Sequence, residues 1–144
     1  EDRLAGQAFP AYLGQHVFED VVWQAYRRFF EAKGLPAVDE WGRWAGKDRD
    51  RNDVEIDVVA RLLDGRVLSG SAKMRSRPTG ADALLQHLTD LRRLADSGRA
   101  WARQALAPES PLLFASTAGF KDSFLAAAED VGHPLILWTA EDLF

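Results

Sequence analysis

The sequence has 144 residues, 47% of them hydrophobic, and it contains no cysteine. This length is enough for one hydrophobic core and too short for two ordinary domains. The lack of cysteine excludes disulfides and thiolate metal sites, so any metal must be held by oxygen or imidazole. The net charge of −4 argues against a protein that coats nucleic acid nonspecifically. The charge is uneven, however, because residues 43–103 carry 13 Lys or Arg against 9 Asp or Glu.

The chain begins with Glu1 and enters a helical pattern almost at once. We therefore expect residues 1–144 to be a single domain excised from a larger protein. No apolar run approaches the roughly 20 residues of a membrane span, and no signal-peptide pattern opens the chain. We expect a cytoplasmic protein without a membrane partner, and the sequence leaves a homo-oligomer open.

The first half of the chain predicts a helix and then a strand. Apolar residues recur close to the 3.6-residue helical period over residues 9–33, and Gly34 and Pro36 end the helix. Residues 38–46 fit a strand less clearly.

A β-hairpin is predicted next. The alternation of apolar and polar residues over 54–62 is typical of a strand, and it places these apolar residues on one face: Val54, Ile56, Val58, Ala60 and Leu62. Asp64 and Gly65 turn the chain into a second strand over residues 66–75, with Ser69, Ser71 and Lys73 on a common face.

The second half predicts one long helix followed by a parallel β-α-β unit. Thr79 and Asp82 resemble a capping box, and the helix that they open extends to about Leu106. Apolar runs at 112–115 and 135–138 fit buried strands on either side of a short helix. The predicted order is αβββαβαβ, an α/β fold with a mixed sheet of about five strands and helices on both faces.

Acidic and basic side chains of the hairpin suggest chemistry on phosphodiesters. Hydrolysis with a divalent cation needs acidic oxygens for the metal and a cation beside the attacking water or the phosphate. Asp57 on the first strand and Lys73 on the second, with position 71 between them, have the spacing of an acidic residue followed by a (D/E)-x-K element.

These motifs resemble those of the PD-(D/E)xK nuclease superfamily, which has a restriction-endonuclease-like core. The ordered motifs are Glu19, then Glu55-Ile56-Asp57, then Ser71-Ala72-Lys73, then Gln86. More narrowly, the sequence is similar to the nuclease-like domain at the C-terminus of archaeal-type P-loop ATPases. That similarity is carried by residues 12–19, the Trp41-Gly42-Arg43-Trp44 segment and residues 55–60.

The resemblance implies a particular site and particular partners. Glu19, Asp57 and residue 71 would share Mg²⁺ or Mn²⁺, Lys73 would be the catalytic cation, and Gln86 would support the motif. DNA would be the substrate, and an N-terminal ATPase module would belong to the full-length protein. Position 71 departs from the family, because Ser71 offers a neutral hydroxyl, a poor Mg²⁺ ligand, where a carboxylate is expected.

The turn of the hairpin decides whether the site can form, because residues that face each other across an antiparallel pair project to the same side. A two-residue turn would pair Asp57 with Ala72. A three-residue loop with a left-handed Gly65 would pair Asp57 with Ser71 and Glu55 with Lys73. We predict the three-residue loop, in which Glu55 either replaces the missing carboxylate or pairs with Lys73.

Several arginines are candidate contacts to a phosphate backbone. Arg92, Arg99 and Arg103 recur at helical spacing, and Arg75 and Arg77 follow the second hairpin strand. The alternative for all of them is a solvated charged face.

The histidines do not suggest a metal site. His16, His87 and His133 are too far apart in sequence for a metal-binding spacing, so we expect structural roles for them.

Two functions remain open from the sequence. The first is metal-dependent hydrolysis of DNA phosphodiesters, in an active or a degenerate form, with Asp57, Lys73, Ser71 and Glu55 at the catalytic position. The alternative is a noncatalytic domain that keeps the nuclease fold to bind DNA or to dock on and regulate its ATPase. Ser71 favours this alternative.

Overall fold

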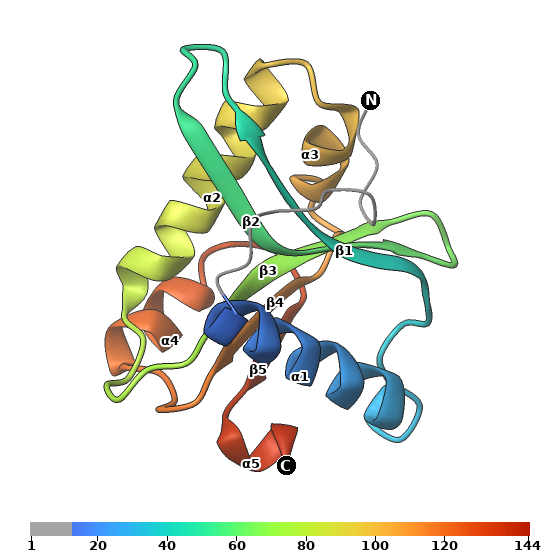
Figure 1. The fold of residues 1–144 in the computed structure, drawn as a ribbon, viewed down its shortest axis with the longest axis vertical. Helices are drawn as coiled ribbons and strands as arrows, with labels where there is room; N and C mark the ends of the chain where they lie inside the picture. The colour runs from blue at the N-terminus through green and yellow to red at the C-terminus, as the bar shows by residue number, and fades with distance from the viewer. Residues whose placement is uncertain (1–12) are drawn as a thin grey trace.

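The computed structural model describes residues 13–144 and contains one five-stranded mixed sheet in the order β1-β2-β3-β4-β5 (Figure 1). The first three strands are antiparallel neighbours, whereas β3, β4 and β5 are mutually parallel. The strands are β1 (Val38–Lys47), β2 (Asp53–Leu62), β3 (Val67–Lys73), β4 (Leu112–Ser116) and β5 (Leu135–Trp138). The predicted mixed sheet of five strands is confirmed.

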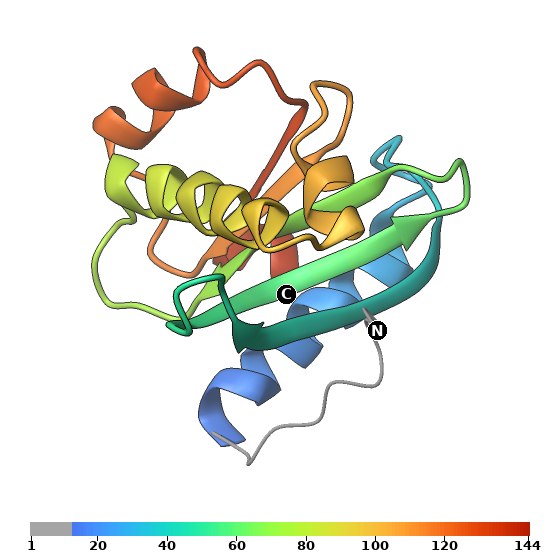
Figure 2. The same cartoon turned by 90° about the horizontal axis from the view of Figure 1, so that it is seen from above.

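Helices cover both faces of the sheet, as predicted (Figure 2). The helices are α1 (Leu13–Phe29), α2 (Ala81–Asp96), α3 (Ala100–Ala105), α4 (Asp122–Ala128) and α5 (Ala140–Leu143). One buried cluster joins the sheet to α2, α3 and α4, and a second joins the other face to α1 and α5. No helix of residues 13–144 is long and apolar enough to cross a membrane.

Helix α1 ends close to where the sequence predicted. Gly34 adopts a left-handed φ of 68°, and Leu35 N–H donates to the Phe30 carbonyl at 2.8 Å, which closes the helix end. Phe18, Val22 and Tyr26 of its inner face are fully buried against the sheet. Residues 9–12 of the predicted helix lie outside the described part of the chain.

The β2–β3 hairpin has the predicted three-residue loop. Val58 pairs with Gly70 and Arg61 pairs with Val67. Leu62 N–H donates to the Arg66 carbonyl at 2.9 Å, and Gly65 has the left-handed φ of 92° that the loop requires. The register therefore leads to Asp57 lying opposite Ser71, although the ladder of paired residues ends at Val58 and Gly70.

A β-bulge in β2 corrects the predicted faces of that strand. Gly42 of β1 pairs with Val59 and Trp44 pairs with Ile56, so that Asp57 and Val58 together face one residue of β1. The extra residue reverses the alternation of side chains. Val54 and Ile56 consequently pack in the cluster with α2, whereas Val58, Ala60 and Leu62 pack in the cluster with α1. The prediction that these five residues share a face was wrong.

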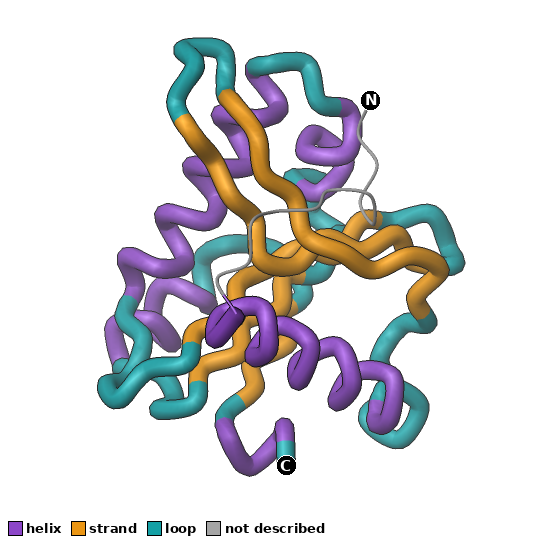
Figure 3. The backbone as a smooth tube through the Cα atoms, in the orientation of Figure 1, coloured by secondary structure: helices purple, strands orange, loops and turns teal. Residues whose placement is uncertain are grey.

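The predicted long helix is two helices, α2 and α3. Gly98 has a φ of 96°, and the N–H groups of Ser97 and Gly98 close the end of α2 by bonding back to carbonyls in its last turn. Helix α3 then starts at Ala100 in a new direction, as Figure 3 shows in purple, and buries Trp101 in the core. The glycine ended a helix that the apolar periodicity alone predicted to continue.

Candidate functional site

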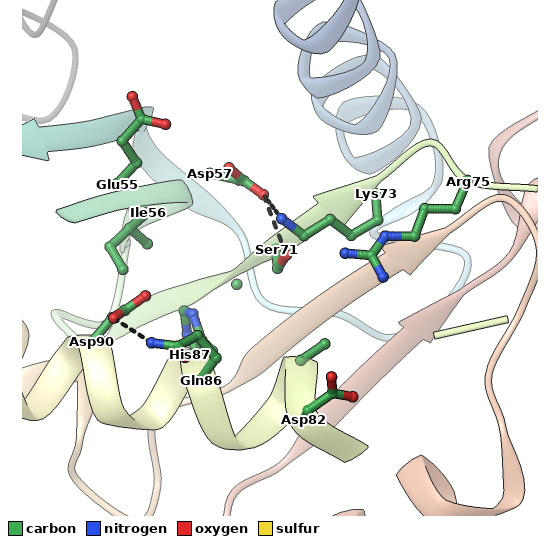
Figure 4. Close-up of a pocket in the computed structure, with 12 residues that line it drawn as sticks. Glu55, Ile56, Asp57, Ser71, Lys73, Arg75, Asp82, Gln86, His87 and Asp90 are labelled. Carbon is green, nitrogen blue, oxygen red and sulfur yellow. Dashed lines mark hydrogen bonds and ion pairs between the residues drawn. The ribbon is translucent and has the colours of Figure 1, made fainter. Parts of the chain in front are cut away.

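A pocket of about 260 Å³ opens between strands β2 and β3 and helix α2 (Figure 4). Strand β2 contributes Glu55, Ile56 and Asp57, and β3 contributes Gly70, Ser71 and Lys73. The remaining lining residues are Arg75 and, on α2, Asp82, Ala83, Gln86, His87 and Asp90. The resemblance implied a site that Asp57 and Lys73 share with Glu19 of the first helix, whereas the structure places the pocket of Asp57 and Lys73 against α2.

Asp57 is the most connected carboxylate of the pocket. Its Oδ2 accepts a hydrogen bond from the Ser71 hydroxyl at 3.2 Å and one from the Ala72 backbone N–H at 3.0 Å. The Asp57 side chain thus satisfies a β3 amide at the point where the backbone ladder between β2 and β3 has ended. The bulge at Asp57 and Val58, which lies in the pairing of β2 with β1, thus coincides with the end of the β2–β3 ladder, where the Asp57 carboxylate accepts a β3 hydrogen bond.

Lys73 is the cation that faces this carboxylate. Its Nζ lies 3.7 Å from Asp57 Oδ2, and its side chain is 35% exposed, so the ammonium keeps contact with solvent. The Glu55 side chain, by contrast, is exposed and forms no hydrogen bond or ion pair with another residue of the described range. The predicted pairing of Glu55 with Lys73 is not realised, because the antiparallel ladder ends before it reaches either residue.

His87 forms part of the pocket floor and is almost completely buried. Its Nε2 lies 2.9 Å from the Ser69 hydroxyl of β3, and its ring makes an edge contact with Phe114 of β4. Burial lowers the pKa of His87 to about 3, with smaller contributions from the charges of His133 and Lys73. The imidazole is therefore neutral, and the predicted structural role suits its contacts.

His133 also makes a contact suited to a structural role, since its Nδ1 lies 2.9 Å from the Ser110 carbonyl oxygen. The side chain of His16 lies outside the described residues.

Gln86 lines the pocket from α2, and its support of the catalytic motif stays a prediction. Its amide donates to Asp90 Oδ1 at 2.9 Å, and Arg93 donates to the same oxygen at 3.1 Å. Arg93 also holds Asp48 in the β1–β2 turn, with Nη2 2.7 Å from Asp48 Oδ2. The backbone N–H of Asn52 is the largest of several groups that lower the pKa of the Asp48 carboxyl. This network attaches the tip of the β1–β2 hairpin to the helix that lines the pocket.

Glu19 is buried on α1 and does not line the pocket. Its Oε1 lies 3.5 Å from Arg43 Nη1, and Arg43 is the β1 residue opposite the bulge at Asp57 and Val58. The structure therefore pairs the predicted metal ligand Glu19 with a cation. Its metal role stays a prediction.

The predicted DNA-binding arginines divide into two groups. Arg75 lines the pocket, and Arg77 is exposed on the same β3–α2 loop. Arg92 is exposed on α2 and Arg103 on α3, whereas Arg99 precedes α3 and lies over the Trp44 ring at 5.0 Å. The prediction of one arginine face along one helix was wrong, because Gly98 divides that helix.

The oxygen donors at positions 57 and 71 do not fit a divalent-cation site. Asp57 Oδ2 is already engaged by two hydrogen bonds and by Lys73, and the Ser71 hydroxyl donates its proton to that same carboxylate. Mg²⁺ and Mn²⁺ require several oxygen ligands, preferably anionic ones. Within residues 13–144, no group of three or more Asp, Glu or His side chains is placed to hold a metal ion. The arrangement is a hydrogen-bonded carboxylate beside a cation.

Comparison with solved structures places the fold. No protein-family model matches the sequence, and no curated protein matches it. The structure of the MspJI restriction endonuclease, in complex with a 27-mer oligonucleotide, is similar to 90% of this chain with a TM-score of 0.55 and 17% sequence identity. The fold is restriction-endonuclease-like.

A second similar structure is that of AF1548, a protein of unknown function, with a TM-score of 0.50 and 18% identity over 85% of this chain. The aligned region spans 26% of the MspJI chain and 64% of the AF1548 chain. At these identities the similarity concerns the fold alone.

The sequence predicted as site residues six of the side chains that line the pocket: Glu55, Asp57, Ser71, Lys73, Arg75 and Gln86. It missed the acidic residues of α2. Asp82 and Asp90 line the pocket, yet each looks like an ordinary exposed helix residue in the sequence. The sequence spacing could have identified both, because Asp82, Gln86 and Asp90 recur every four residues and therefore lie on one face of the helix, the face that lines the pocket.

Proposed function

We propose that this domain binds the phosphodiester backbone of DNA at the pocket between β2, β3 and α2 and does not hydrolyse it. The proposal depends above all on one observation: Ser71 occupies the place of a second carboxylate and donates a hydrogen bond to Asp57 at 3.2 Å. At the motif position the site keeps one carboxylate, Asp57, which protein donors already engage. Two cations, Lys73 and Arg75, line the same pocket, and three further carboxylates line it from β2 and α2: Glu55, Asp82 and Asp90.

Cations so placed suit a phosphate group. The Lys73 ammonium is partly exposed, and Arg75 is exposed with its guanidinium directed into the pocket region in Figure 4. Lysine provides a point charge, and arginine provides a planar pair of donors that matches phosphate oxygens. The Asp57 carboxylate orients Lys73 in the absence of a ligand. Such contacts give affinity without sequence specificity.

Hydrolysis of DNA is the second candidate. It is favoured by the 3.7 Å approach of Lys73 to Asp57 and by the exposed Glu55 at the rim of the same pocket, which provides a further carboxylate. The role of the domain beside an ATPase module, the assembly of several copies and a cytoplasmic location remain predictions from the sequence.

A binding and cleavage experiment separates the two functions. The 144-residue chain is titrated into a fluorescent DNA duplex in buffers of increasing salt, and the same protein is incubated with supercoiled DNA in Mg²⁺ or Mn²⁺. We expect salt-sensitive binding that Lys73→Ala and Arg75→Ala each weaken, with the DNA left intact. Cleavage by the unmodified chain that is lost in Asp57→Ala would refute a purely binding role. Absence of binding at low salt would refute both functions.

Ser71→Glu is the informative companion variant, because it returns a carboxylate to the position opposite Asp57. We expect the unmodified chain to show no rise in melting temperature when Mn²⁺ is added and the Ser71→Glu chain to show one. Ser71→Gln serves as the matched control, since it has the same size without the charge. An equal rise in all three proteins would mean that Ser71 is not what prevents metal binding.

A further inference from the structure

Two loops that are far apart in sequence lie side by side next to the pocket. The β3–α2 loop covers residues 74–80, and the β4–α4 loop covers residues 117–121. They follow the carboxyl ends of adjacent parallel strands, where Lys73 pairs with Ser116. Ligands of α/β sheets commonly bind at this end of the strands.

Hydrogen bonds join the two loops along their length. Thr79 N–H donates to the Gly119 carbonyl at 2.9 Å, and Lys121 N–H donates to the Thr79 carbonyl at 2.8 Å. The buried Thr79 hydroxyl donates to Ser116 Oγ at 2.8 Å. The loops therefore continue the pairing of β3 and β4 beyond the sheet, with Thr79 and Phe120 forming a parallel bridge.

Thr117 holds the backbone of Arg75 from both sides. Its Oγ1 accepts a hydrogen bond from Arg75 N–H and donates one to the Arg75 carbonyl, each at 2.9 Å. Thr117 N–H also donates to the Lys73 carbonyl at 3.2 Å. One threonine of the β4–α4 loop thus fixes the backbone on which both proposed phosphate-binding cations are carried.

Lys121 adds a cation from the second loop. A Cβ placed on Gly80 would lie 3.4 Å from Lys121 Cδ and 3.2 Å from Asp82 Oδ1, so the side chains of Lys121 and of the pocket-lining Asp82 both lie next to Gly80. Lys121 is exposed and, among the described residues, forms no ion pair.

The charge of the two joined loops has a single sign. Residues 73–80 contain Lys73, Arg75 and Arg77, residues 116–121 contain Lys121, and neither stretch contains an Asp or Glu. Lys121, which belongs to the acidic C-terminal part of the sequence, therefore adds a positive charge next to those of the basic middle segment.

We infer that the two joined loops form one phosphate-binding surface, in which Lys121 contacts the nucleic-acid backbone and Thr117 positions Arg75. The inference rests on the proposed function of the neighbouring pocket and extends it from one phosphate group to adjacent phosphates of a strand. Arg75 and Lys121 act as contacts. Thr117 acts through Arg75 and touches no ligand itself.

Salt-dependent binding of a fluorescent DNA duplex tests the surface. The slope of log K against log salt is negative, and each phosphate contact that is lost reduces its magnitude by about 0.9. We expect Lys121→Ala to show this decrease. Arg28→Ala is the charge-matched control, because it removes one exposed cation from α1 on the opposite face of the sheet, and we expect it to leave the slope unchanged.

Threonine variants test the positioning. Thr117→Val removes both hydrogen bonds to Arg75 at nearly constant volume, and we expect it to weaken binding about three- to tenfold at constant melting temperature. Thr117→Ser keeps the hydroxyl and should restore binding. In the Arg75→Ala background, Thr117→Val should have no further effect on affinity, which a merely structural role would not predict.

The outcomes distinguish this inference from the proposed function. If Arg75→Ala weakens binding while Lys121→Ala and Thr117→Val do not, the pocket binds DNA and the two-loop surface is refuted. If Lys121→Ala lowers the slope but Thr117→Val has no effect, the positioning role is refuted. If the unmodified chain does not bind DNA at low salt, the proposed function fails as well.

Discussion

The neutral His87 beneath the pocket makes the stability of the domain depend on pH. The pKa of His87 is lowered from 6.5 to about 3 because the imidazole is buried between Ser69 and Phe114. The unfolded chain takes up a proton near pH 6.5, whereas the folded chain does so only near pH 3. The stabilisation from this group is therefore complete above pH 6.5 and is lost as the pH falls towards 3.

The expected magnitude follows from the two pKa values. Between pH 7.5 and pH 5.0, the protonation of His87 in the unfolded chain alone should lower the free energy of unfolding by about 2 kcal/mol. Urea denaturation followed by circular dichroism at the two pH values measures this difference. In His87→Gln the dependence from this residue should vanish, whereas His133→Gln is the control and should retain it. Equal pH dependence in the unmodified chain and in His87→Gln would refute the assignment.

Three further predictions concern elements around the pocket. Gly70→Ala should lower the free energy of unfolding by at least about 3 kcal/mol in urea denaturation, because the new Cβ would lie 1.7 Å from the Leu113 carbonyl oxygen; a fully stable variant would contradict this packing. Asp48→Ala should speed hydrogen exchange at the amides of Asp50 and Asn52, which now donate to Asp48 Oδ1 at 2.9 Å, and unchanged exchange would mean that this carboxylate does not hold the turn. Arg92→Ala combined with Arg103→Ala should leave the salt slope of DNA binding unchanged, because α2 and α3 are separate helices; a decrease of the slope by about 1.8 would restore the arginine face that the sequence predicted.

Local patterns predicted the hairpin well. The Asp64-Gly65 turn left two registers open, and the three-residue loop was chosen because it pairs Asp57 with Ser71, a register that the structure confirms. The register then placed Asp57, Ser71 and Lys73 together, as the hydrogen bond and the 3.7 Å ion-pair distance in the structure show.

Longer-range features were not predictable in the same way. The bulge at Asp57 and Val58 arises from the pairing of β2 with β1, and a regular alternation of apolar residues concealed it. The pairing of Glu19 with Arg43 joins α1 to β1 and depends on how the helix crosses the sheet. Helix α3 was missed for a different reason, since the apolar periodicity continued past Gly98 and outweighed the one residue that ends α2.

The bulge in β2 also constrains how this strand can vary in length. It has one residue more than its partner between the pairs Gly42–Val59 and Trp44–Ile56. Loss of that residue would make the two strands equal and turn every side chain from Asp53 to Ile56 to the opposite face. Val54 and Ile56 would leave the core, and acidic residues would enter it. A deletion of one residue between Ile56 and Val59 would therefore remove apolar side chains from the cluster that packs against α2.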